Sequence, residues 1–138
     1  HGMFVDINLD LYVADYYNNR IQLFRLNQRN GITVAGNGSA KLTIALYYPS
    51  GVVLDGDQHL FIVDCYNHRI IGSDDNGFRC IFGCYDKMNG HTNDRLYHPI
   101  SMSFDSYGNI YVTDRLNNRV QKIVKNQLCS KFFSFDLK

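Results

Sequence analysis

The sequence contains no glutamate and only four alanines among its 138 residues. Because glutamate and alanine favour helices, their scarcity argues against a helical protein. The acidic residues are instead 13 aspartates, and they are accompanied by 14 asparagines and 11 glycines, residue types that favour tight turns. Ten tyrosines and nine phenylalanines supply bulky rings that are common in strands. The composition therefore predicts an all-β protein with many turns.

Several classes of protein are excluded by features that the sequence lacks. No apolar run approaches the roughly 18 residues that a membrane-spanning segment needs. The net charge is only +1, so a generally basic nucleic-acid-binding protein is not expected. The sequence has no Gly-x-Ser-x-Gly, no phosphate loop, no His-Glu-x-x-His and no dinucleotide-binding glycine pattern. We therefore predict no catalytic residues and a protein that is not an enzyme.

One seven-residue pattern occurs three times, beginning at Asp15, Asp64 and Asp114. Each copy places an asparagine three residues, and an arginine five residues, after its aspartate. Because a catalytic constellation need occur only once, we interpret the repeated residues as structural. Aspartate and asparagine stabilise turns by bonding backbone N–H groups, and arginine bridges a turn to its neighbour. These structural residues are Asp15, Asn18, Arg20, Asp64, Asn67, Arg69, Asp114, Asn117 and Arg119.

The copies divide the chain, as a single domain, into repeats at residues 1–48, 49–98 and 99–138. Each contains four short β-like runs, which in the second copy are Val52–Leu54, Leu60–Val63, Arg69–Ile71 and Arg79–Phe82. A repeat of about 40–50 residues with four antiparallel strands is typical of a propeller blade. The sequence therefore predicts an all-β propeller segment of three four-stranded antiparallel blades.

The repeated segments resemble NHL repeats. The resemblance rests on Pro49–Asp55, Leu60–Asp64 and Asp64–Ile70 with their counterparts, and on the glycine-rich Val34–Gly38, which is similar to the link between NHL blades. Cys129–Phe135 replaces the third such link, which is a departure from the pattern. The resemblance implies a ring that usually has six blades. We therefore expect an incomplete ring, closed by blades of a longer protein or by a second copy of this chain.

The resemblance implies a non-catalytic scaffold that binds a protein or peptide through loops on one face. The alternatives are a metal-dependent enzyme similar to the amidating lyase or to a lactonase, a single-stranded RNA binder, and the substrate-recruiting part of a ubiquitin ligase. No histidine recurs at one-blade spacing, so no metal site or cofactor is predicted. Nucleic-acid binding would rest on the only basic cluster, Arg115, Arg119, Lys122, Lys125 and Lys131.

Residues that differ between copies are the better candidates for binding, because variable loops on a rigid scaffold usually carry function. In a four-stranded meander, the repeated turn and the links 36–48 and 83–98 share one face, while His59 lies at the opposite one. Tyrosine and arginine are enriched where proteins bind each other. We predict binding by Tyr16, Tyr17, Asn19, Tyr66, His68, Arg115 and Asn118.

The four cysteines allow three full disulfide pairings. Cys80 and Cys84 are spaced to close a short loop across a strand end, and buried free thiols are the alternative. The segment Asn37–Ser39 is a glycosylation sequon. The location of the protein is left open, with an extracellular or lumenal setting favoured over a cytoplasmic one.

Overall fold

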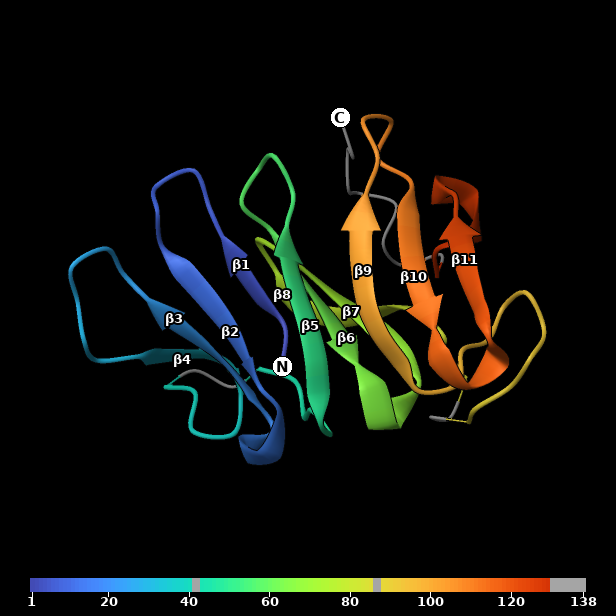
Figure 1. Cartoon of the computed structure of the whole chain (residues 1–138), viewed down its shortest axis with the longest axis horizontal. Helices are drawn as coiled ribbons and strands as arrows, with labels where there is room; N and C mark the ends of the chain where they lie inside the picture. Colours follow the sequence, from blue (N-terminus) through green and yellow to red (C-terminus); the bar gives the residue numbers. More distant parts are fainter. Residues whose placement is uncertain (41–42, 86–87, 130–138) are drawn as a thin grey trace.

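The computed structural model describes residues 1–40, 43–85 and 88–129. The strands in these residues form three antiparallel sheets (Figure 1). The first sheet has the strand order β1-β2-β3-β4, and the second has the order β5-β6-β7-β8. The strands of the first sheet are β1 (Met3–Val5), β2 (Leu11–Asp15), β3 (Arg20–Phe24) and β4 (Ile32–Gly36). Those of the second are β5 (Pro49–Leu54), β6 (Leu60–Asp64), β7 (Arg69–Asp74) and β8 (Gly77–Phe82).

The third sheet has the order β11-β10-β9 within the described residues. It consists of β9 (Pro99–Phe104), β10 (Ile110–Asp114) and β11 (Arg119–Ile123). Residues 130–138, which hold most of the segment predicted to replace the third link, lie outside the described residues. Single-turn 3-10 helices follow the second strand of each sheet and the last strand of the third. They are η1 (Tyr16–Asn18), η2 (Cys65–Asn67), η3 (Arg115–Asn117) and η4 (Lys125–Gln127).

The predicted all-β fold of antiparallel blades is confirmed, and the three sheets do not close into a ring. The four runs predicted for the second copy coincide with β5 to β8, but the strands extend beyond them. The third and fourth strands continue into a hairpin in which Asp74 pairs with Gly77. Asp74 and Gly77 are therefore part of the strands because their backbones pair, although their side-chain types favour turns.

Two apolar cores lie between successive sheets. The core between the first and second sheets includes Ala14, Ile21 and Ile62, and the core between the second and third includes Phe61, Ile70 and Val112. All six of these side chains are fully buried. Neighbouring residues of β6, Phe61 and Ile62, enter different cores because successive side chains of a strand point to opposite faces. This two-sided burial explains why the strand is continuously apolar.

The two ends of the blades carry different connections (Figure 1). Hairpins β1–β2, β5–β6 and β9–β10 lie at one end, and η1, η2 and η3 lie at the other. The links between sheets meet the second end, since the N–H groups of Tyr66 and Leu116 donate to the carbonyls of Tyr47 and Tyr97. We call this end, with η1, η2, η3 and the described residues of links 36–48 and 83–98, the turn face. Among the described residues, no helix is long and apolar enough to span a membrane.

Candidate binding face

The repeated aspartate organises the turn face. In the second copy, Asp64 Oδ2 accepts hydrogen bonds from Arg69 Nε at 2.8 Å and Asn67 Nδ2 at 2.9 Å. Its other oxygen, Oδ1, accepts from the backbone N–H of Tyr47 at 2.7 Å. The Arg69 Nη2 donates to the Ala45 carbonyl at 2.9 Å. The repeated residues therefore fasten the incoming link to the blade, with the Asp64 side chain fully buried.

The third copy repeats this arrangement, and the first copy keeps part of it. Asp114 Oδ1 accepts from the Tyr97 N–H at 2.7 Å, and Arg119 Nε donates to Asp114 Oδ2 at 2.8 Å. Asp15 accepts from Arg20 Nε at 2.8 Å but is 27% exposed at its side chain. Partial burial acts to raise the pKa of Asp15, and the bonds from Arg20 and Asn18 outweigh it, so that the pKa lies below the usual value. These contacts are what a structural role requires.

The residue after the 3-10 turn joins the blade to the next link in the first two copies. Asn19, His68 and Asn118 have φ of 53°, 52° and 50°, the left-handed conformation that ends the turn. Asn19 Oδ1 accepts from the Tyr48 N–H at 2.8 Å, and His68 Nδ1 accepts from the His98 N–H at 3.1 Å. Two residues predicted to bind a partner thus hold the links in place. Their participation in binding stays a prediction.

Glycine is required where a link leaves a blade. Gly36 and Gly83 have φ of 82° and 70°, a conformation that costs glycine little. A Cβ on Gly36 would collide with the Asn19 carbonyl, and one on Gly83 would collide with the His68 carbonyl. The chain therefore passes closely over the ends of η1 and η2, which brings the link residues onto the turn face.

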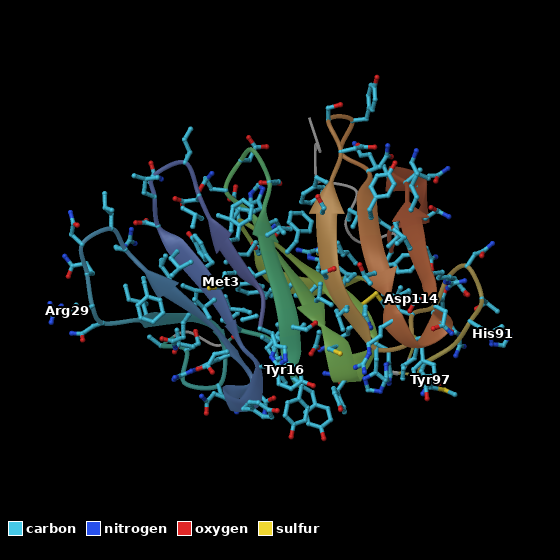
Figure 2. The ribbon with its side chains drawn as sticks, viewed as in Figure 1. Met3, Tyr16, Arg29, His91, Tyr97 and Asp114 are labelled. Carbon is cyan, nitrogen blue, oxygen red and sulfur yellow. A yellow bond between two sulfur atoms is a disulfide. The ribbon has the colours of Figure 1, made fainter. Side chains whose placement is uncertain are left out.

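Six aromatic residues form a continuous row on the turn face, which we call the aromatic strip. Ring centroids are 4.9 Å apart between Tyr16 and Tyr48, 4.8 Å between Tyr48 and Tyr66, and 4.3 Å between Tyr66 and His98. Tyr17 flanks Tyr16 at 5.1 Å, and Tyr47 flanks Tyr66 at 5.4 Å. The exposed fraction is 79% for Tyr17, 46% for Tyr47 and 40% for Tyr66. Figure 2 shows Tyr16 and Tyr97 at the turn-face end of the blades.

Sequence reasoning identified half of this strip. Tyr16, Tyr17 and Tyr66 are predicted residues, whereas Tyr47, Tyr48 and His98 come from the links. The missing signal is a second repeated element, since Leu46–Pro49 and Leu96–Pro99 share Leu-Tyr-x-Pro at a spacing of 50. The variable residue of this element precedes the proline and adopts a positive φ, 50° at Tyr48 and 47° at His98.

A pocket of about 480 Å³ lies between the first strands of the three sheets. The residues directly after the repeated aspartates, Tyr16, Cys65 and Arg115, all contribute to its lining. We call this hollow the inner pocket. Three residues at one place in the repeat therefore meet there, although each has a different chemistry. Tyr16 and Arg115 are among the predicted binding residues, whereas Cys65 is not.

Four titratable groups around the inner pocket and the strip have pKa values shifted toward the neutral form. Burial raises the pKa of the Cys65 thiol to about 11 and that of the Tyr16 phenol to about 12. Burial, followed by the neighbouring His98, lowers the pKa of His68. Burial, followed by the Arg115 charge, lowers the pKa of His98. Arg115 adds a positively charged side chain to the pocket lining, and its charge acts on His98 of the strip.

His59 lies at the opposite end of the blades, as predicted, in a turn with Asp55 and Asp57. Ligand atoms of these three residues lie within 4.8 Å of one another. However, Asp55 Oδ1 already accepts the N–H groups of Asp57 and His59, at 3.0 and 2.8 Å. Asp105 makes the equivalent bonds to Tyr107 and Asn109, without any histidine. The grouping is therefore accounted for by a repeated turn.

The cysteines divide into a buried thiol and a cluster of three. Cys80 and Cys84 form a disulfide with Cα atoms 5.7 Å apart, the short loop allowed by their spacing. Cys129 Sγ lies 2.7 Å from Cys84 Sγ, and its backbone N–H donates to the Ile81 carbonyl at 2.8 Å. Cys65 is free and buried in the inner pocket.

Two members of the predicted basic cluster make contacts within the chain. Arg119 Nη1 and Nη2 donate to link carbonyls of His91, Thr92 and Arg95. The Lys122 ammonium lies over the Tyr111 ring, 5.8 Å from its centroid. Lys131 lies outside the described residues. The Arg119 guanidinium is therefore bonded within the chain, whereas Arg115 lines the inner pocket.

Comparison with known families and structures agrees with the repeat geometry. Residues 46–72, which include β5, β6 and η2, match the NHL repeat family. The match covers the first half of the second repeat. No significant match was found among curated proteins.

Solved propeller proteins share the fold. Virginiamycin B lyase from Staphylococcus aureus has a TM-score of 0.63 at 12% identity, covering 91% of this chain and 38% of that one. A gluconolactonase from Xanthomonas campestris has a TM-score of 0.60 at 20% identity, with coverages of 83% and 34%. An auxiliary nutrient binding protein from Bacteroides thetaiotaomicron has a TM-score of 0.67 at 19% identity, with the same coverages. The chain thus spans little more than a third of these proteins.

Proposed function

We propose that this NHL-repeat chain is a non-catalytic scaffold that binds a peptide segment of a partner protein across the turn face. The observation that carries the proposal is the aromatic strip. Its rings extend from the first blade to the start of the third on connections whose side chains differ between copies. Exposed tyrosines give large contact area with few rotatable bonds, which suits them to peptide recognition.

The underlying scaffold supports this role. The repeated aspartates and arginines hold the link backbones by hydrogen bonds at 2.7–3.0 Å, so the strip is held before a partner arrives. A preorganised surface loses less conformational entropy on binding than a mobile one. We expect side chains of the strip to adjust and its backbone to stay in place.

A non-catalytic role fits the chemistry of the turn face. The Cys65 thiol is protonated at neutral pH, and the Asp64 and Asp114 carboxylates are buried and bonded by arginine. His68 Nδ1 accepts a backbone N–H, so this atom already has a partner. The names of the lyase and lactonase describe those proteins. For this chain, metal analysis after dialysis tests the enzymatic alternative, with stoichiometric zinc or calcium contradicting the scaffold proposal.

Display of random 12-residue peptides against the full chain tests the proposed function. We expect enriched peptides whose affinity falls about tenfold or more for Tyr17→Ala, because truncating an interface tyrosine commonly removes over 1 kcal/mol. The matched control is Tyr107→Ala. Tyr107 is 88% exposed, comparable to 79% for Tyr17, but it lies in the hairpin at the opposite end. Absence of enriched peptides, or an equal loss for both variants, would contradict binding by the turn face.

A further inference from the structure

We infer that the inner pocket receives a carboxylate of an acidic peptide, with the Arg115 guanidinium as its counter-ion. This inference rests on the proposed function, because the peptide that enters the pocket is one that also lies across the aromatic strip. The ligand class is a peptide with an aspartate, glutamate or terminal carboxylate beside apolar residues.

Arg115 differs from five other arginines, which are paired with aspartates, and it lines the inner pocket, whereas Arg29 and Arg95 do not. Arg20, Arg69 and Arg119 each place Nε 2.8 Å from the aspartate of their own repeat. Arg25 and Arg79 also lie within 4.0 Å of aspartate oxygens. No aspartate of the described residues lies within that distance of Arg115. An exposed guanidinium without a carboxylate, at the edge of a pocket, is available to an anionic ligand.

The adjacent aspartate does not neutralise Arg115 by contact. Asp114 is fully buried, and its two oxygens accept hydrogen bonds from Arg119, Asn117 and the Tyr97 N–H. Asp114 and Arg115 are therefore neighbours of opposite charge that contact different parts of the structure. Asp114 faces inward to the repeated arginine, whereas Arg115 contributes to the pocket lining.

The rest of the pocket favours an anion. No acidic residue is found in its described lining. The Tyr16 phenol and the Cys65 thiol are both protonated at neutral pH, so neither carries a competing negative charge. Val52 and Met102 provide apolar walls, where charge-assisted hydrogen bonds are strengthened by reduced contact with water.

Tyr16 explains why a peptide should bind more tightly than a small free anion that carries the same carboxylate. Its ring belongs to both the inner pocket and the aromatic strip, since it lines the first and lies 4.9 Å from Tyr48 in the second. Figure 2 shows Tyr16 at the foot of the inner strands, on the turn face. An acidic side chain held by Arg115 would therefore place its neighbouring residues over tyrosine rings.

The first test observes the arginine Nε–H signals of the full chain by NMR during titration with N-acetylglutamate. We expect a saturable shift of the Arg115 signal, assigned with Arg115→Lys, and no matching shift with N-acetylglutamine. The Arg119 signal is an internal control, because its Nε already donates to Asp114. No shift, or equal shifts for Arg115 and the exposed Arg29, would overturn the inference whether or not any peptide binds.

The second test repeats the peptide display with Arg115→Gln. We expect acidic residues to be enriched among peptides selected by the parent chain, and the affinity of those peptides to fall about 10- to 100-fold for the variant. An unchanged melting temperature would show that the fold is intact. Peptides that depend on Tyr17 but show no acidic preference would leave the proposed function standing and contradict this inference.

Discussion

Asp64 and Asp15 hold the same place in the middle and first copies of the repeat, yet their surroundings differ. Asp64 is fully buried and bonded to Arg69, Asn67 and the Tyr47 N–H. Asp15 is bonded to Arg20 and Asn18, and its side chain is 27% exposed. The difference is the link, which covers Asp64 and fastens to it. The same sequence pattern therefore has a stability contribution that depends on what packs over it.

The apolar positions show the same contrast. Ile70 of the middle copy is fully buried between the second and third sheets, whereas its counterpart in the third copy, Val120, is 67% exposed. In the first copy, Met3 corresponds to the buried Val52 but is 68% exposed. Only the middle sheet is covered on both faces by described residues. We expect it to be the most stable of the three.

Removal of the repeated aspartate should separate the two copies most strongly. Asp64→Ala removes the buried counter-ion of Arg69 and leaves Arg69 Nε and the Tyr47 N–H without their acceptor, which should lower the free energy of unfolding by about 3–5 kcal/mol. Asp15→Ala breaks an ion pair that contacts water and should cost at most about 1 kcal/mol. Urea unfolding of both variants measures the difference. Equal losses would contradict the role assigned to the link.

Truncation of the apolar positions should give the next largest contrast. Ile70→Ala opens a cavity in a core and should cost about 2–5 kcal/mol. Val120→Ala removes exposed methyl groups and should change stability by less than about 0.5 kcal/mol. Thermal unfolding of both variants at the same protein concentration gives the comparison. A large loss for Val120→Ala would show that another surface covers the third sheet in solution.

The junctions between blades should differ in pH dependence. His68 Nδ1 accepts a hydrogen bond where the first junction uses the amide oxygen of Asn19. Burial, then the neighbouring His98, lowers the His68 pKa, with Asp114 acting in the opposite direction. The unfolded chain therefore binds the proton more readily than the folded protein. Stability should be full above about pH 6.5 and decline as the pH falls toward the folded-state pKa.

His68→Asn converts the second junction to the chemistry of the first. It should flatten the decline below pH 6.5, a slope that is limited to about 1.4 kcal/mol per pH unit for one group. His98, whose pKa is also lowered by burial, is retained in the variant and sets the residual slope. Unfolding curves of both proteins between pH 5 and 8 test this. Parallel curves would show that His68 does not carry the pH dependence.

The fold could be predicted because the repeated pattern marks where each blade begins and ends. Asp15, Asp64 and Asp114 fix the register, and the apolar runs around them fix the strands. Half of the aromatic strip was missed, because Tyr47, Tyr48 and His98 lie outside the aspartate pattern, in links whose path depends on bonds to distant residues. Nor does side-chain type reveal that Asn19 and His68 are already bonded to the next link.

The central claim is that repeated residues build the scaffold and unrepeated residues bind. Tyr66 and Asn67 are adjacent on η2, and only Asn67 belongs to the repeated pattern. Melting temperature and affinity for a display-selected peptide should be measured for Tyr66→Ala and Asn67→Ala. We predict the larger loss of affinity for Tyr66→Ala and the larger loss of melting temperature for Asn67→Ala, which removes a buried amide bonded to Asp64. The reverse assignment would contradict the claim.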